Sequence, residues 1–172
     1  MRTVKGFIGI LALTLVLGTA AFSQTVLQSL GGGSVNLDAQ RGKVVVLAVG
    51  ASWLPLSTRQ IDITNTLAKK YQGKDIVFYF VATDSTRPGK NFASDDDIRK
   101  FATTNKIAAG SVLRDSDGAI TLRKYSIDQV PSFVVIGKDG QMVAEPFGGL
   151  DSSPNSKYDI TVPISRAIDK AL

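Results

Sequence analysis

The amino-acid sequence predicts an α/β fold with a mixed central sheet, helices on both faces of that sheet and an N-terminal β-hairpin. Two apolar runs, 44–49 and 75–83, have the composition of strands that are buried on both sides. A segment with helical spacing of apolar residues follows each run, at 56–71 and at 95–105. Two strand-like segments joined by a tight turn and one more helix close the chain, so parallel β-α-β units precede an antiparallel hairpin.

The N-terminal hairpin is predicted from a glycine run. Gly31-Gly32-Gly33-Ser34 separates two short segments with spaced apolar residues, and consecutive glycines suit the turn between two strands. The alternative, a phosphate-binding loop, needs a buried strand before the glycines and a helix that opens with Lys and Ser or Thr after them. The sequence has neither, so we favour the turn.

The predicted helices have recognisable ends. Pro55 precedes 56–71, and a proline in the opening turn of a helix loses no hydrogen bond. Ser94 can cap the helix 95–105, and Asp97 three residues later completes a capping box. Apolar residues in the last helix recur on one face, at Ile164, Ala167, Ile168, Ala171 and Leu172.

The remaining elements are short. We predict a strand at 111–114, a turn, and a short helix at 119–125. Pro131 must begin the next strand, because a proline inside a strand removes a ladder hydrogen bond. Asp-Gly within 137–140 is a strong hairpin signal and predicts a return strand at 141–147.

Two acidic groups resemble cation sites. Asp115-Ser116-Asp117-Gly118 looks like the opening of a calcium loop, but such a loop needs Gly at its sixth position and Glu at its twelfth, where Ile120 and Ser126 stand. Asp95-Asp96-Asp97 is better explained as a helix start, because carboxylates favour the positive end of the helix dipole. We therefore predict no metal site.

The composition excludes several kinds of chemistry. The 172 residues include no cysteine and no histidine, so disulfides, thiol exchange and Ser-His catalysis are impossible. The usual imidazole and thiolate ligands of zinc, copper and haem are missing as well, and we predict no cofactor. A formal net charge of +5 without any Lys/Arg cluster argues against nucleic-acid binding.

Residues 1–23 have the pattern of a secretory signal peptide. Two basic residues precede an apolar run at 7–17, and small residues come before the predicted cleavage at Gln24. The run is shorter than the ~20 apolar residues that a bilayer-spanning helix needs, although an uncleaved anchor stays an alternative. We expect a single domain, 24–172, that is exported to the periplasm or the extracellular space without a stable membrane anchor.

The junction of the first buried strand and the first helix reads Ser52-Trp53-Leu54-Pro55-Leu56-Ser57. It resembles the active-site turn of thioredoxin-like proteins of the TlpA or redoxin (AhpC/TSA-like) type, which reads Trp-Cys-Pro-Pro-Cys. Val130-Pro131-Ser132 is similar to the family's x-Pro-Thr, and Lys138-Asp139-Gly140 to its hairpin. The resemblance spans about 30–172 and implies a thioredoxin-like three-layer sandwich in which Pro131 is cis and faces the turn that carries Trp53.

Leu54 and Ser57 stand where that family has its two redox cysteines. Leu54 carries no nucleophile, and Ser57 has no histidine base, so we expect the Ser57 side chain to form a hydrogen bond at the helix start instead. The resemblance implies descent from oxidoreductases, yet we predict no catalytic residue and no enzyme activity.

The altered turn is predicted to bind rather than to react. Contiguous exposed apolar residues usually form a binding surface, and active relatives pair the strip beside the cis-proline with an extended segment through backbone hydrogen bonds. We therefore expect a non-catalytic module that binds an extended segment of a partner protein. The predicted groove consists of Trp53, Leu54, Pro55, Leu56, Ser57, Val130 and Pro131. The alternative is that Trp53 and Leu54 pack under neighbouring loops.

Two other functions stay open. A redoxin-type thiol-disulfide protein could act through the thiols of a partner, or through an acidic site at Asp84, which follows the second buried strand. One carboxylate without a partner is a poor acid-base site. The other function is that of a structural subunit in an envelope assembly.

Overall fold

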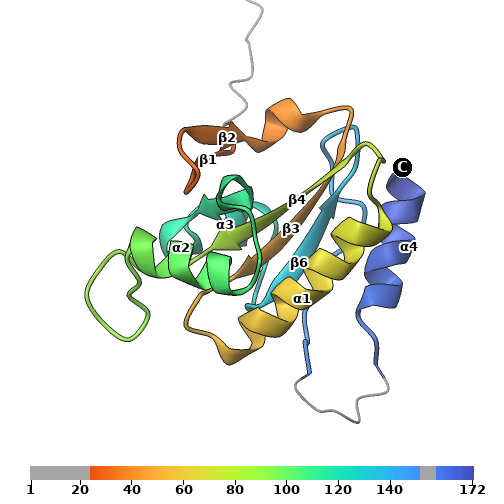
Figure 1. Ribbon diagram of the computed structural model, residues 1–172. Helices are drawn as coiled ribbons and strands as arrows, with labels where there is room; N and C mark the ends of the chain where they lie inside the picture. The colour runs from red at the N-terminus through yellow and green to blue at the C-terminus, as the bar shows by residue number, and fades with distance from the viewer. Residues whose placement is uncertain (1–23, 152–157) are drawn as a thin grey trace, which may run out of the picture.

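A six-stranded mixed sheet forms the middle layer of the computed structural model, which describes residues 24–151 and 158–172 (Figure 1). The strand order is β2-β1-β5-β4-β3-β6; β3 and β5 each run parallel to β4, and the other neighbours are antiparallel. The strands are β1 (Val26–Ser29), β2 (Ser34–Asn36), β3 (Val44–Gly50), β4 (Ile76–Ala82), β5 (Val112–Arg114) and β6 (Ser132–Ile136). The predicted mixed sheet and N-terminal hairpin are confirmed. The predicted signal peptide lies outside the described residues.

The helices lie on both faces of the sheet, as the sequence predicts. One face is covered by α1, α2 and α4, and the opposite face by the short α3 together with η1 (Figure 1). No helix within the described residues has the length and apolar character needed to cross a membrane. The helices are α1 (Pro55–Lys70), α2 (Asp95–Thr104), α3 (Thr121–Lys124), α4 (Thr161–Ala171) and the 3-10 helices η1 (Leu37–Gln40), η2 (Ala109–Ser111) and η3 (Ser116–Gly118).

Strand β3 separates two hydrophobic clusters. Val44, Val46 and Ala48 pack towards the α1, α2 and α4 layer, whereas Val45 and Leu47 pack towards the opposite layer. Every residue of β3 is buried. Because neither face of β3 is in contact with water, every position of the strand favours an apolar residue, which explains the continuous apolar run in the sequence.

The first half of β4 is less buried than its apolar sequence predicts. Residues from Ile76 to Tyr79 are only partly buried, while Phe80 to Ala82 are buried. The reason is that β5 pairs only with Phe80–Ala82, so one edge of the earlier half of β4 has no neighbouring strand. A buried strand over the whole of 75–83 was therefore too strong a prediction.

The predicted return strand at 141–147 is wrong as a continuous element. The tight turn forms, with Gly140 N–H donating to the Gly137 carbonyl at 2.9 Å. Beyond it the backbone pairs with β6 only at separate points, Met142 opposite Ile136 and Phe147 opposite Phe133. The two paired points are farther apart in sequence on the return segment than on β6, so the return segment has extra residues and bends between them, at 143–145.

The acidic groups that resembled cation sites are helix starts. Ser94 and Asp97 form the predicted capping box at the start of α2. The Asp115 carboxylate accepts hydrogen bonds from the backbone N–H groups of Ile120 and Thr121 and from the Thr121 hydroxyl. Among the residues that the structure describes, no three acidic side chains gather as a metal site would require.

Candidate binding site

The turn between β3 and α1 is fastened to the end of β4. Asp84 is fully buried, and its carboxylate accepts the Ser52 backbone N–H at 2.9 Å and the Ser52 hydroxyl at 2.6 Å. Since a buried carboxylate needs hydrogen-bond donors, these contacts fix the backbone just before Trp53. Asp84 is thus enclosed and engaged in holding the turn, which does not suit the acid-base role that we considered from the sequence.

Helix α1 begins without a side-chain cap. Leu54 occupies the N-cap position, Pro55 opens the helix, and the Ser57 backbone N–H donates to the Leu54 carbonyl at 3.0 Å. The Ser57 side chain is fully buried, and its hydroxyl has no partner among the described residues. The predicted hydrogen bond from this side chain at the helix start is therefore wrong, because Ser57 points into the core rather than towards the free N–H groups.

Gln60 links three elements beneath the turn. Its side-chain amide donates to the carbonyl of Val49 at 3.2 Å and to that of Ser132 at 2.8 Å. It therefore holds the start of β6 against β3 and α1. Sequence reasoning missed this residue, although a glutamine on the buried face of a helix is a signal that its amide has a structural partner.

Glycine is needed at the end of β3. A Cβ atom at Gly50 would come within 2.5 Å of Gln60 Oε1 and 3.0 Å of Ser57 Oγ. A larger residue there would therefore displace the buried side chains of Gln60 and Ser57, which explains why the apolar run of β3 ends in glycine.

The Val130–Pro131 segment lies beside the turn, as the resemblance implies. The peptide bond between these residues is cis, and Val130 and Trp53 line the same pocket of about 190 Å³. Pro131 is buried and Val130 is half-buried. Within the part of the chain that the structure describes, no hydrogen bond uses the backbone N–H or carbonyl of Val130.

Trp53 forms a ridge between two hollows. Trp53 is 45% exposed. On one side lies the pocket shared with Val130, and on the other a shallow groove of about 480 Å³ between the start of α1 and helix α2. The shallow groove is lined by Ser52, Trp53, Leu54, Pro55, Thr58, Asp97, Lys100, Phe101, Thr104 and Asn105.

The structure therefore brings most of the predicted groove together. Trp53, Leu54 and Pro55 line the hollows, and Val130 faces them from the opposite segment. Leu56 is half-buried, whereas Ser57 and Pro131 are buried and support the surface from below. No local pattern in the sequence predicts that α2 forms the second wall of the shallow groove.

Asp97 and Lys100 give the wall formed by α2 a mixed charge. The Ser94 hydroxyl and backbone N–H donate to the Asp97 carboxylate, at 2.6 Å and 3.0 Å, and these hydrogen bonds hold the pKa of Asp97 below its ordinary value. Asp97 is therefore ionised throughout the neutral range and contributes a fixed negative charge.

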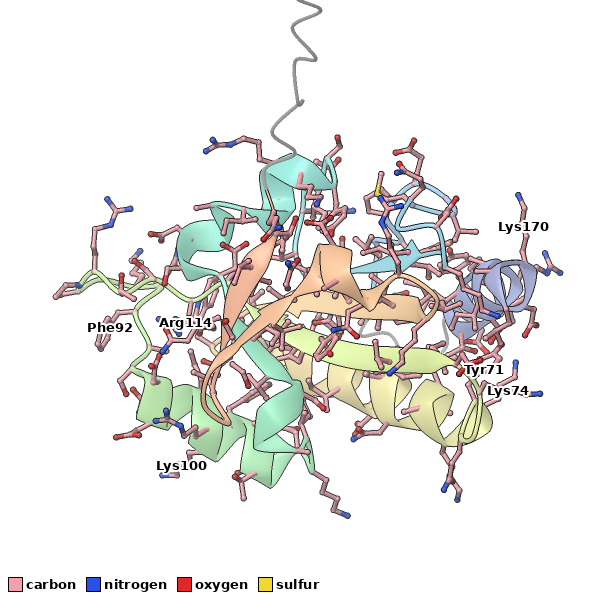
Figure 2. The ribbon with its side chains drawn as sticks, turned by 90° about the horizontal axis from the view of Figure 1, so that it is seen from above. Tyr71, Lys74, Phe92, Lys100, Arg114 and Lys170 are labelled. Atoms are coloured by element: carbon pink, nitrogen blue, oxygen red, sulfur yellow. The ribbon has the colours of Figure 1, made fainter. Side chains whose placement is uncertain are left out.

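The loop 84–93 covers the other end of the site and is held by Arg114. The buried guanidinium donates to the Ala93 carbonyl at 2.9 Å and to the Ser85 carbonyl at 3.4 Å. Figure 2 shows Arg114 next to the segment that carries Phe92, on the side of the molecule away from Lys170. Since a buried cation requires such acceptors, this loop has a defined position over the site.

This architecture, a mixed sheet with a cis-proline segment beside the turn that begins a helix, defines a thioredoxin-like protein. A family model for Redoxin matches residues 18–159, and the chain therefore belongs to the redoxin family. Curated protein sequences contain no significant match to this chain. Redox chemistry by cysteine, the basis of thiol-disulfide exchange, is unavailable because the sequence has no cysteine.

Solved structures of similar proteins support the fold. A Chlorobium tepidum protein assigned as the thiol:disulfide interchange protein DsbE is 21% identical, with a TM-score of 0.68, over 87% of this chain and 93% of its own. The exposed lipoprotein thioredoxin Etrx1 of Streptococcus pneumoniae is 21% identical, with a TM-score of 0.63, over 86% of this chain and 99% of its own. A secreted Mycobacterium tuberculosis disulfide oxidoreductase is 19% identical, with a TM-score of 0.60, over 86% of this chain and 96% of its own. At these identities the likeness establishes the fold alone.

Proposed function

We propose that this redoxin-family protein is a non-catalytic binding module that holds an extended segment of a partner protein against the Trp53 ridge. The observation that carries the proposal is the exposed Trp53 beside Val130, whose backbone forms no hydrogen bond with any of the described residues. An extended segment could pair with the Val130 backbone as an added strand does, while its side chains enter the hollows on either side of Trp53.

The loss of cysteine is consistent with binding in place of catalysis. Leu54, at the position of the first family cysteine, lines the shallow groove together with Pro55. Leucine there adds apolar contact area to a surface that already has a large aromatic ring, and such surfaces are typical of protein interfaces. Ser57, at the second cysteine position, is buried and would not touch a partner.

Export is part of the same proposal. The signal-like pattern of residues 1–23 supports it. Two of the similar structures are described as a secreted oxidoreductase and an exposed lipoprotein thioredoxin. We infer that the mature module works in the periplasm or outside the cell, where extended segments of unfolded or assembling proteins are available.

The binding proposal can be tested with the protein's own fluorescence, since Trp53 is the sole tryptophan of the chain. A library of twelve-residue peptides of random sequence is screened on immobilised protein, and the retained peptides are titrated in solution while the emission of Trp53 is followed. We expect saturable changes in emission for wild type. Leu54→Asp should weaken binding by about tenfold or more, as loss of a central apolar contact does.

Met142→Asp is the matched control, because Met142 is also an exposed apolar residue but lines a different hollow, beside α4. It should bind the peptides as wild type does. Equal affinity of Leu54→Asp and wild type would rule out the Trp53 ridge as the binding surface. Turnover of a disulfide substrate by the purified wild type would instead favour the enzyme alternative.

A further inference from the structure

We propose that the pocket between Trp53 and Val130 accepts a lysine or arginine side chain of the bound segment, with Asp117 as its charge partner. This inference rests on the proposed function and specifies the chemistry of the segment. The pocket is lined by Ala51, Trp53, Thr83, Asn91, Asp117, Leu122 and Val130.

The lining separates into an apolar wall and a polar end. Ala51, Leu122 and Val130 supply aliphatic surface, and Trp53 supplies an aromatic face. Thr83, Asn91 and Asp117 supply oxygen atoms that can accept hydrogen bonds. A volume of about 190 Å³ has room for one long side chain. The side chains of lysine and arginine match this arrangement, because each has an apolar stem and a charged end.

The charge of the pocket favours a cation. Among the described residues that line the pocket, Asp117 alone is charged, and its side chain is 42% exposed. A glutamate or aspartate of the partner would be repelled by this carboxylate. An aliphatic side chain would cover Asn91 and Asp117 without bonding to them, which is unfavourable for polar groups.

The chain itself shows that Asp117 accepts a guanidinium. Arg87, from the loop 84–93, donates to Asp117 Oδ2 at 3.1 Å, and the Arg87 side chain is 81% exposed. Exposed ion pairs of this kind contribute little to stability. An arriving lysine or arginine can therefore replace Arg87 at small cost and, unlike Arg87, can reach Asp117 through the pocket.

Trp53 would add a second attraction. The face of an indole ring attracts ammonium and guanidinium groups more strongly than other aromatic rings do. Because Trp53 is a wall of the pocket and is still 45% exposed, it can gain this contact when a segment binds. The same ring would thus anchor the segment and favour a positively charged side chain at one of its positions.

Asp117 is well suited to a charge-only substitution. Its backbone is in the left-handed region, with φ 58° and ψ 14°. Asparagine tolerates this conformation as well as aspartate does. Asp117→Asn therefore keeps the backbone and removes the negative charge, and it leaves the neighbouring cap formed by Asp115 unchanged.

The probe is a set of five synthetic peptides, identical except for Lys, Arg, Leu, Glu or Ala at one position. Their common sequence is a twelve-residue peptide retained in the library screen, and the varied position is the one at which an alanine scan weakens binding most. Affinities are measured by titration of Trp53 fluorescence. We expect the Lys or Arg peptide to bind wild type about fivefold more tightly than the Leu and Glu peptides.

Three variants make the test specific. Asp117→Asn should reduce the preference for Lys or Arg to less than about twofold, whereas Arg87→Ala should strengthen binding of the Lys peptide by about twofold, because a competing cation is gone. Asp75→Asn, at an exposed position just before β4, is the control and should behave as wild type.

Each outcome has a distinct meaning. Peptide binding without a preference for Lys or Arg, or with a preference that Asp117→Asn leaves intact, would overturn the pocket inference and leave the proposed function standing. If no peptide in the library binds wild type, the proposed function and the pocket inference fail together.

Discussion

Single residues around the turn are arranged to hold Trp53 at the surface. Asp84 fastens the backbone at Ser52, and Gln60 joins the start of β6 to α1. Both side chains are fully buried. Burying a ring as large as that of Trp53 would lower the free energy of the protein. We therefore attribute the exposed position of Trp53 to the hydrogen bonds of Asp84 and Gln60, which hold the turn in place.

Asp84→Asn should destabilise the protein. Asp84 Oδ1 accepts from both the N–H and the hydroxyl of Ser52, and Oδ2 accepts from the same N–H. Asparagine replaces one of these oxygens with an NH₂ group, which cannot accept from the Ser52 N–H, and its remaining neutral oxygen is a weaker acceptor than a carboxylate at this fully buried position. We expect the free energy of unfolding to fall by about 1–3 kcal/mol. The measurement is urea unfolding followed by circular dichroism. Asp75→Asn serves as the exposed control, and equal stability of the two variants would show that the Asp84 contacts with Ser52 are unimportant.

At the scale of elements, the sequence predicted those parts whose signals are local. The capping box of α2 follows from Ser94 and Asp97 alone, and the burial of β3 follows from an uninterrupted apolar run. The predicted return strand after β6 is wrong as a continuous element because the segment from Met142 to Phe147 has more residues than the facing part of β6, from Ile136 to Phe133. Turn residues specify where a hairpin begins, whereas its length depends on every later residue.

The site was predicted less completely than the fold, for a physical reason. The Trp53 turn and Pro131 could be located from their resemblance to the family pattern. Two of the partners that position them, Asp84 and the wall of α2, are distant in sequence from the turn and are brought to it only by folding. Gln60 is close to the turn in sequence, but its partner Ser132 is not. The buried side chain of Ser57 likewise depends on the direction in which α1 packs.

Because of the cap of α2, the free energy of unfolding should depend on pH. The hydrogen bonds from Ser94 lower the pKa of Asp97 in the folded protein relative to the unfolded chain. The stabilising effect is therefore complete above the unfolded value of about 4, and it is lost as the pH falls through the lowered pKa.

The comparison that checks this is between wild type and Asp97→Asn, unfolded with urea at several pH values. Wild type should exceed the variant in free energy of unfolding at pH 7, and the difference should shrink towards pH 3. A difference that stays constant with pH would mean that the charge of Asp97 plays no part in the cap.

At the scale of the whole molecule, the thioredoxin-like framework is present without the two cysteines of the family's active-site turn. The cis segment at Pro131 still lies beside the turn, and α1 still begins at Pro55. The N-terminal end of a helix stabilises a thiolate, so this framework should support a cysteine if one is supplied.

The double variant Leu54→Cys, Ser57→Cys should therefore gain measurable activity in a disulfide-reduction assay, whereas wild type should have none. Leu54→Cys alone is the control, because a single thiol can attack a disulfide but lacks the second cysteine that resolves the mixed disulfide. A folded double variant that is no more active than the single variant would indicate that the turn no longer has the geometry of a redox site.

The proposed function depends on one proposed contact, between the backbone of Val130 and an extended segment beside Trp53. Hydrogen exchange of the Val130 amide, followed by NMR with and without a peptide retained in the library screen, measures that contact directly. We expect exchange at Val130 to slow by about tenfold or more on binding, as it does when an amide enters a strand pairing. Unchanged exchange at Val130 in the presence of saturating peptide would contradict strand-like pairing at this site.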